Sequence, residues 1–312
     1  MGVKDLRFGL HALALSAHEE WVSTARQAEE VGFSALTVAD HLADGCISPF
    51  AALGVAAEAT STLRVGTLVL NNDLRHPAVV AREVLALDSL SGGRVELGLG
   101  AGHGFPEYLS AGIRFDDVKT RVARLAEAIE MLDGLLRGHD VTFTGDHYRL
   151  IAHRAWPPPT QRPRPPLLVG GNGRRLLQMA AERADTVSLT GTGRTKPDGL
   201  THVATGFPSE AVDERVALVR AASAGRDVEL QALVQRVTIT DDPRGTAERA
   251  RELLPELSVE DILATPYLWI GTVQSICEHI LAARERWGFS YFTVFHHSLE
   301  VATPIVTRLA NT

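Results

Sequence analysis

The dipeptide Asp40-His41 combines two residue types that can handle protons. It follows Ala35–Ala39, an apolar stretch that suits a buried strand. Histidine titrates near neutral pH, and a neighbouring carboxylate can orient it or share its proton, so the pair suits acid–base chemistry or the positioning of a ligand. A purely structural histidine at a strand end is the alternative interpretation.

A second motif, Gly170-Gly171-Asn172-Gly173-Arg174-Arg175, lies between an expected strand and an expected helix. Free N–H groups at a helix start bind phosphate, and glycine lets the anion come close. The two arginines add charge suited to phosphate or carboxylate. The motif therefore predicts a phosphate site, with a tight turn and surface arginines as the alternative.

A third motif is the glycine run from Gly98 to Gly104, which contains Gly100, Ala101 and Gly102. It superficially resembles a dinucleotide-binding fingerprint, but it opens no helix at once and no acidic residue ends the next strand. A backbone platform for a planar ring is the functional interpretation, and a flexible turn is the plain one.

Several other polar and aromatic residues fall in expected loops near these motifs. Packing is the default role for each of them: Glu107, Tyr108, Phe207 and Trp269.

The elements that must position these motifs alternate between strand and helix along most of the chain. Arg64–Leu70 and Val95–Leu99 are apolar strands joined by a helix that starts at Pro77, which is the pattern of a parallel unit. Eight such strands predict an α/β fold, a (β/α)8 TIM barrel with insertion segments, and a doubly wound sheet is the second choice. In a barrel all three motifs would share the face at the carboxyl ends of the strands.

We expect residues 1–312 to form a single domain. An irregular insertion is expected at about 139–166, because six prolines lie between Trp156 and Leu167. A lid-like loop is expected at about 190–208, which is long, polar and rich in glycine.

Composition narrows the classes of function. The net charge of −7 argues against nucleic-acid partners. The sequence has neither an apolar run long enough for a membrane span nor a signal-peptide layout, so we expect no membrane association and a cytoplasmic location. Cys46 and Cys277 form no CxxC pair and are expected to be free thiols. No metal-binding HxH or HExxH spacing occurs, and no GxSxG nucleophile motif, so we expect neither a metal site nor that hydrolase chemistry.

The residues resemble a known family at several points in the expected order. VGTLVLNNDLRHP and LDSLSGGRVELGLGAG resemble the bacterial luciferase-like flavin and deazaflavin oxidoreductases. ADH at 39–41, PPLLVGGNGRR at 165–175 and WGFSYFTVF at 287–295 resemble the coenzyme F420-dependent branch of that superfamily. The resemblance implies a luciferase-like barrel with an insertion region and, commonly, a homodimer.

The resemblance also implies roles for individual residues. His41, with Asp40, matches the position near the reactive part of the deazaflavin ring, and Leu68-Val69 matches a step where relatives hold a non-proline cis peptide. Asn71 matches a position that faces the ring edge, and the loop beside the cofactor corresponds to Gly100, Ala101 and Gly102. The phosphate-binding turn corresponds to Gly170, Gly171, Asn172, Gly173 and Arg174. The substrate-side acid corresponds to the region of Glu107 or His103.

The function implied is hydride transfer between C5 of F420 and a small organic substrate, with His41 stabilising charge on the ring or relaying a proton. Three alternatives stay open. One is an FMN-dependent monooxygenase of the same fold that uses reduced flavin and O₂, and another is a non-catalytic F420-binding protein. The third is a barrel enzyme without flavin, although no lysine at an expected strand end supports a Schiff-base version.

Overall fold

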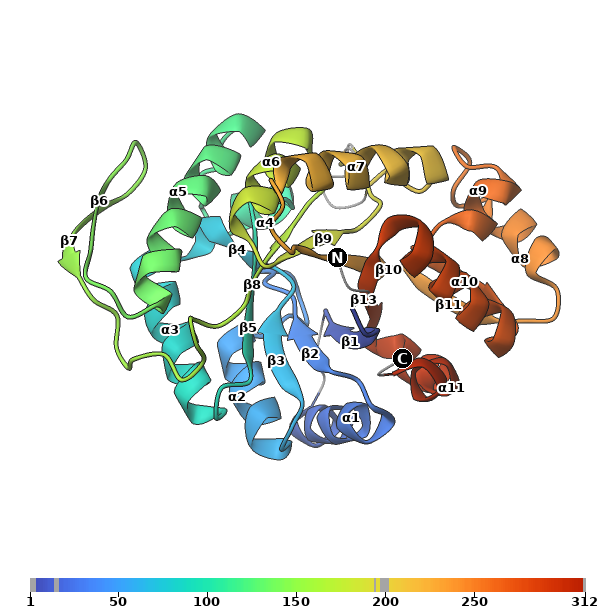
Figure 1. Cartoon of the computed structure of the whole chain (residues 1–312), viewed down its shortest axis with the longest axis horizontal. Helices are drawn as coiled ribbons and strands as arrows, with labels where there is room; N and C mark the ends of the chain where they lie inside the picture. Colours follow the sequence, from blue (N-terminus) through green and yellow to red (C-terminus); the bar gives the residue numbers. More distant parts are fainter. Residues whose placement is uncertain (1–3, 14–16, 194, 197–201, 311–312) are drawn as a thin grey trace.

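The computed structural model describes residues 4–13, 17–193, 195–196 and 202–310. Parallel strands form a closed barrel with helices packed around it (Figure 1). The eight barrel strands, in chain order, are β1 (Arg7–Ala12), β2 (Ala35–Val38), β3 (Arg64–Thr67), β5 (Val95–Gly100), β8 (Leu167–Gly170), β9 (Thr186–Leu189), β10 (Glu229–Val234) and β13 (Phe289–Phe295). The predicted (β/α)8 fold is confirmed, and the doubly wound sheet is excluded.

The first and last strands close the barrel. Phe8 in β1 is in register with Phe292 in β13, while Val65 in β3 is in register with Val95 in β5. Nearly every position of these strands is buried, because one side faces the barrel interior and the other faces helices. Their carboxyl ends therefore meet at one face, which we call the mouth of the barrel.

Helices cover the outside of the barrel (Figure 1). The longer ones are α1 (His18–Val31), α2 (Pro49–Ala59), α3 (Pro77–Leu90), α5 (Val118–Leu136), α6 (Arg174–Arg183), α7 (Ser209–Ala222), α10 (Val273–Trp287) and α11 (Leu299–Leu309). The shorter ones are α4 (Phe105–Ser110), η1 (Asn72–Leu74), α8 (Pro243–Ala250), α9 (Val259–Ala264) and η2 (His296–Ser298). None of them, within the described residues, is both long and apolar enough to cross a membrane.

Helix α5 shows how local sequence sets these elements. Its buried stripe includes Leu125, Ile129 and Leu132, at the spacing of one helical face. The helix begins at Val118. The reason is that the Asp117 side chain accepts a hydrogen bond from the backbone N–H of Thr120 at 2.8 Å and caps the helix there.

The strand predicted at Arg64–Leu70 is interrupted. β3 ends at Thr67, the Leu68–Val69 peptide is cis, and the chain then resumes as β4 (Leu70–Asn71), which pairs with β5. The cis peptide implied by the family resemblance is therefore present. β4 places Asn71 directly beside Gly100 at the mouth.

Two other segments differ from the expected loops. Glu107 and Tyr108 lie on α4 and are both buried. Trp269 lies in β12 (Leu268–Gly271), which pairs in parallel with β11 (Arg236–Ile239), and its side chain is fully buried in the core. These elements are only four to six residues long, so they carry too little periodicity to be read from sequence.

The stretch 139–166 contains a hairpin, β6 (Val141–Thr144) and β7 (Arg149–His153), which projects from the barrel near α5 (Figure 1). The proline-rich part after it is fixed to α3. Asp88 accepts hydrogen bonds from the backbone N–H groups of Thr160 and Gln161 at 2.7 and 3.1 Å.

A network of charged residues fills the opposite end of the barrel, at the amino ends of the strands. Arg7 contacts Glu229 at 2.6 Å and Glu96 at 2.8 Å, and Arg64 contacts Glu96 at 2.6 Å. Burial alone would raise the pKa of Glu96, but Arg7 and Arg64 hold it below its usual value. The network therefore stays ionised and paired.

Candidate active site

Asp40 follows β2 and ties the mouth together. Its carboxylate accepts a hydrogen bond from Arg75 at 2.7 Å and one from the backbone N–H of Asn71 at 3.0 Å. Asp40 is buried, at 5% exposure, and these contacts join the end of β2 to β4. Its observed partners thus assign it to fixing the backbone of the mouth, while a different carboxylate contacts His41.

That carboxylate belongs to Glu107 on α4. Its Oε1 lies 2.8 Å from Nδ1 of His41, and its Oε2 accepts a hydrogen bond from the backbone N–H of Leu42 at 2.9 Å. Glu107 is buried, whereas the His41 side chain keeps 26% exposure. The second ring nitrogen, Nε2, has no hydrogen-bond partner among the described residues. His41 thus has one nitrogen held by a carboxylate and one available to a ligand.

Further histidines surround this pair. The His103 ring lies 5.2 Å from the His41 ring and 5.0 Å from the His202 ring, measured between centroids. Desolvation lowers the pKa of His103, and His41 and His202 lower it further. His11 lies deeper, in β1, where complete burial, reinforced by His41 and His296, lowers its pKa to about 3. Both His11 and His103 are therefore neutral at pH 7.

The side chain of Val69 explains two of the predicted glycines. A Cβ at Gly100 would lie 2.5 Å from one methyl of Val69, and a Cβ at Gly170 would lie 3.0 Å from the other. Gly100 and Gly170 thus make room for the residue after the cis peptide. Leu68 and Leu168 belong to the same small cluster of buried apolar residues.

Gly102 is required by its close approach to the residues beneath it. It has a φ of +77°, and a Cβ there would overlap the Tyr108 hydroxyl and lie 2.6 Å from Oδ1 of Asn71. Ala101 beside it is half-buried. The predicted platform at 100–102 is therefore a backbone surface that rests on Val69, Asn71 and Tyr108.

The predicted phosphate turn separates into two parts. The Gly171 N–H donates to the Ser188 carbonyl at 3.2 Å, and a Cβ at Gly171 would lie 2.6 Å from the Leu176 side chain, so Gly171 has a packing role. Gly173 is exposed and caps α6 without a side-chain hydrogen bond, and Arg174 follows it, also exposed. The start of α6 thus combines helix N–H groups without a side-chain cap and a nearby cation, which fits an anion.

The expected lid at 190–208 is described only in part, because residues 194 and 197–201 lie outside the described residues. Thr195 and His202 form an isolated bridge, and the Ala204 N–H donates to Glu256 at 2.7 Å. Phe207 packs on Tyr267 with ring centroids 5.4 Å apart. The contact between the rings of His202 and His103 brings this segment next to the mouth.

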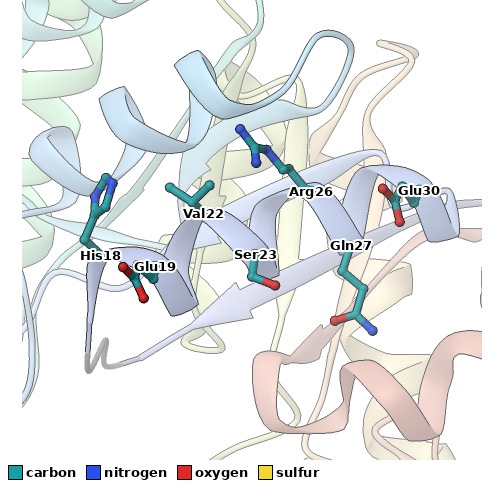
Figure 2. A pocket seen from close by; sticks show the side chains of 7 residues that line it. All are labelled: His18, Glu19, Val22, Ser23, Arg26, Gln27 and Glu30. Carbon is teal, nitrogen blue, oxygen red and sulfur yellow. The ribbon is translucent and has the colours of Figure 1, made fainter.

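The mouth brings together most of the predicted residues, from β2, β4, β5 and α4. Sequence reasoning missed the hydrogen-bond role of Tyr108, whose only signal was its position next to Glu107. No cluster of three or more His, Cys, Asp or Glu that could hold a metal is present in the described ranges. A pocket on the outer surface is separate from this site: all its lining side chains come from α1, as Figure 2 shows.

The sequence profile of the family described as "Luciferase-like monooxygenase" matches residues 7–260. An F420-dependent glucose-6-phosphate dehydrogenase from Amycolatopsis mediterranei (strain U-32) is 35% identical over 171 residues, which cover 53% of this chain and 51% of that protein. The protein of the same name from Nakamurella multipartita is 32% identical over 188 residues, covering 58% and 55%. The chain spans about half the length of these curated relatives.

Solved structures match over almost the whole chain. The F420-dependent tetrahydromethanopterin reductase from Methanopyrus kandleri superposes with a TM-score of 0.77 at 18% identity, covering 98% of both chains. An F420-dependent secondary alcohol dehydrogenase gives a TM-score of 0.75 at 19% identity, also with 98% coverage of both. At these identities the likeness shows the fold.

Proposed function

The chain belongs to the luciferase-like monooxygenase family, and from that premise we propose that it is an F420-dependent oxidoreductase that transfers a hydride between C5 of the deazaflavin and a small organic substrate. The observation that carries the proposal is the His41–Glu107 contact at 2.8 Å, beside the glycine platform at the barrel mouth. The F420 dependence named for curated relatives at 32–35% identity supports the choice of cofactor.

The residues present fit such a cofactor. Gly100, Ala101 and Gly102 present backbone to a planar ring, with Val69 beneath it. The start of α6, with Gly173 and Arg174, fits a phosphate group. When bound there, F420 would supply the deazaflavin carbon that gains or loses the hydride.

His41 would hold or move a proton at Nε2. The Glu107 carboxylate contacts Nδ1, and a carboxylate there favours the tautomer that has its proton on Nδ1. Nε2 is then the atom that can accept a proton from the substrate or the cofactor, or return one. Glu107 acts through His41 and through the Leu42 backbone, which fixes the orientation of the carboxylate.

The test is a fluorescence titration of the protein with F420 and, in parallel, with FMN. Tight F420 binding with weak FMN binding supports the proposal and leads to a substrate screen. Preference for FMN, with O₂ consumption on adding reduced FMN, would instead indicate a monooxygenase. Tight F420 binding without turnover across the screen would indicate a non-catalytic F420-binding protein.

We also propose that the protein forms a homodimer, as the family resemblance implies. Sedimentation equilibrium at micromolar concentration checks this directly: a mass of one chain, 33.7 kDa, would contradict it.

A further inference from the structure

Asn71 and Asn172 both lie at the mouth, and their side-chain amides differ in which atoms already have hydrogen-bond partners. The Asn172 amide nitrogen donates to the hydroxyls of Thr190 and Thr192 at 2.5 and 3.1 Å. Its oxygen accepts from the backbone N–H of Thr190 at 3.4 Å. Asn172 is thus occupied in joining the β8–α6 turn to the start of the lid.

The Asn71 amide is fixed at its oxygen end. Oδ1 accepts hydrogen bonds from the backbone N–H of Asp73 at 3.1 Å and from the Tyr108 hydroxyl at 2.9 Å. A backbone N–H can only donate, so the atom facing it must be the oxygen. The amide nitrogen, Nδ2, has no hydrogen-bond partner among the described residues. It is also not among the fully buried atoms that lack a partner, so solvent reaches it.

Tyr108 is held firmly in this arrangement. Its side chain is 1% exposed, and its single hydroxyl proton is shared between two acceptors, Oδ1 of Asn71 at 2.9 Å and Oδ2 of Asp73 at 3.1 Å. Arg124 pairs with Asp73 at 2.8 Å. Burial raises the pKa of Tyr108 far above its usual value, so the hydroxyl stays protonated and donates at any working pH. The missing Cβ of Gly102 leaves the space in which this hydroxyl reaches Asn71.

We propose that Asn71 presents a pre-oriented N–H donor to an acceptor oxygen on the planar ring bound at the mouth, and that Tyr108 is the positioning residue that sets this orientation. The ligand chemistry it selects is a ring carbonyl or an anionic ring oxygen. Asn71 is in place for this, because its backbone is held by Asp40 and it pairs with Gly100 of the platform. The inference rests on the proposed cofactor function.

The experiment measures the dissociation constant of F420 by fluorescence for the wild type, Asn71→Ala, Asn71→Asp, Tyr108→Phe and the double variant Asn71→Ala/Tyr108→Phe. Asn71→Asp keeps the oxygen that Tyr108 and Asp73 contact but replaces the donor with a charged acceptor, so we expect affinity to fall by about 10- to 100-fold. Tyr108→Phe should cost about 3- to 10-fold. The double variant should bind no more weakly than Asn71→Ala alone, because Tyr108 acts through Asn71.

Tyr148→Phe is the matched control. Its hydroxyl accepts a hydrogen bond from the side chain of Asn72, the next residue, at 3.2 Å, so the variant removes a similar contact without touching the Asn71 amide. We expect unchanged F420 affinity. The absorption band of bound F420 should match the wild type in Tyr148→Phe and shift in Asn71→Ala. Thermal unfolding of every variant checks that the fold is retained.

The outcomes separate this inference from the proposed function. If the wild type binds F420 and Asn71→Asp binds it with the same affinity, the donor role of Asn71 is overturned. Independent, additive losses in the double variant would overturn the positioning role of Tyr108. A wild type that prefers FMN overturns the choice of cofactor, and the same variants are then titrated with FMN, whose ring also carries carbonyl oxygens. Binding of neither would overturn both.

Discussion

The two ends of the barrel use polar side chains in opposite ways. At the amino end, Arg7 and Arg64 both contact Glu96, and Arg7 also contacts Glu229, at 2.6 to 2.8 Å. At the mouth, His41 and Asn71 each have one side-chain atom held by hydrogen bonds and another with no partner among the residues that the structure describes. The difference shows which end can bind a ligand: groups that already satisfy each other hold a structure, whereas groups oriented but half-satisfied are prepared for a partner.

His41→Ala should give the largest effect at the mouth. We expect turnover to fall by about 100-fold or more, because acid–base assistance at Nε2 is lost, while the dissociation constant of F420 changes by less than about threefold. Steady-state kinetics and the fluorescence titration measure the two quantities. His103→Ala, which removes a neighbouring ring without a carboxylate partner, should cost less. Equal losses in turnover and F420 affinity for His41→Ala would remove its catalytic role.

Glu96→Gln tests the other end of the barrel. It leaves two arginines without their shared carboxylate, so we expect the free energy of unfolding to fall by about 3 kcal/mol. The F420 affinity of the folded variant should match the wild type. Asp140→Asn is the control, since its partner Arg154 is exposed and the change should cost at most about 0.5 kcal/mol. Urea unfolding measures the free energy of unfolding of both variants. Similar losses in Glu96→Gln and Asp140→Asn would contradict a stabilising role of the buried network.

His11 makes the barrel interior sensitive to acid. Its folded-state pKa of about 3 lies below the unfolded value of 6.5, so the unfolded chain takes up the proton first. The stabilisation is complete above pH 6.5 and is lost as pH falls toward 3, by about 2 kcal/mol between pH 6.5 and 5. Urea unfolding at these two pH values should show a smaller loss for His11→Asn. His139→Asn, at an exposed position, should lose as much stability between the two pH values as the wild type. If His11→Asn also loses as much as the wild type, His11 is not the source of the acid sensitivity.

Gly173→Asp gives the smallest expected effect and separates binding from stability. A Cβ at Gly173 meets nothing within 4 Å, unlike one at Gly171. Aspartate there can cap α6, so stability should hold or rise by a few tenths of a kcal/mol. Its charge should repel a phosphate, and F420 affinity should fall by about tenfold. Gly173→Ala is the uncharged control. Titration and thermal unfolding test both, and equal F420 affinity in the two variants would place the phosphate elsewhere.

The barrel could be predicted from sequence because its signals are repeated. The strands predicted at Ala35–Ala39 and Val95–Leu99 agree with β2 and β5 to within one residue, and the helix predicted to start at Pro77 is α3. Each element has local periodicity, and their alternation leaves few topologies.

The site could be predicted less completely, because its geometry depends on contacts between distant segments. Nothing local indicates that Glu107 contacts His41 across 66 positions, or that Asp40 is directed to Arg75. The glycines were found, but their reasons differ: Gly100 and Gly170 make room for Val69, and Gly171 for Leu176. Such reasons are properties of packing, which sequence periodicity does not contain.

The pairing of β1 with β13 joins the two ends of the sequence, with Arg7 in register with Tyr291. During synthesis on a ribosome, β1 emerges long before β13, because residues 13–288 lie between them. Until then β1 has β2 on one side and an open strand edge on the other. The nascent chain therefore keeps this edge exposed while the residues between β1 and β13 are synthesised, and an exposed strand edge favours aggregation during that interval.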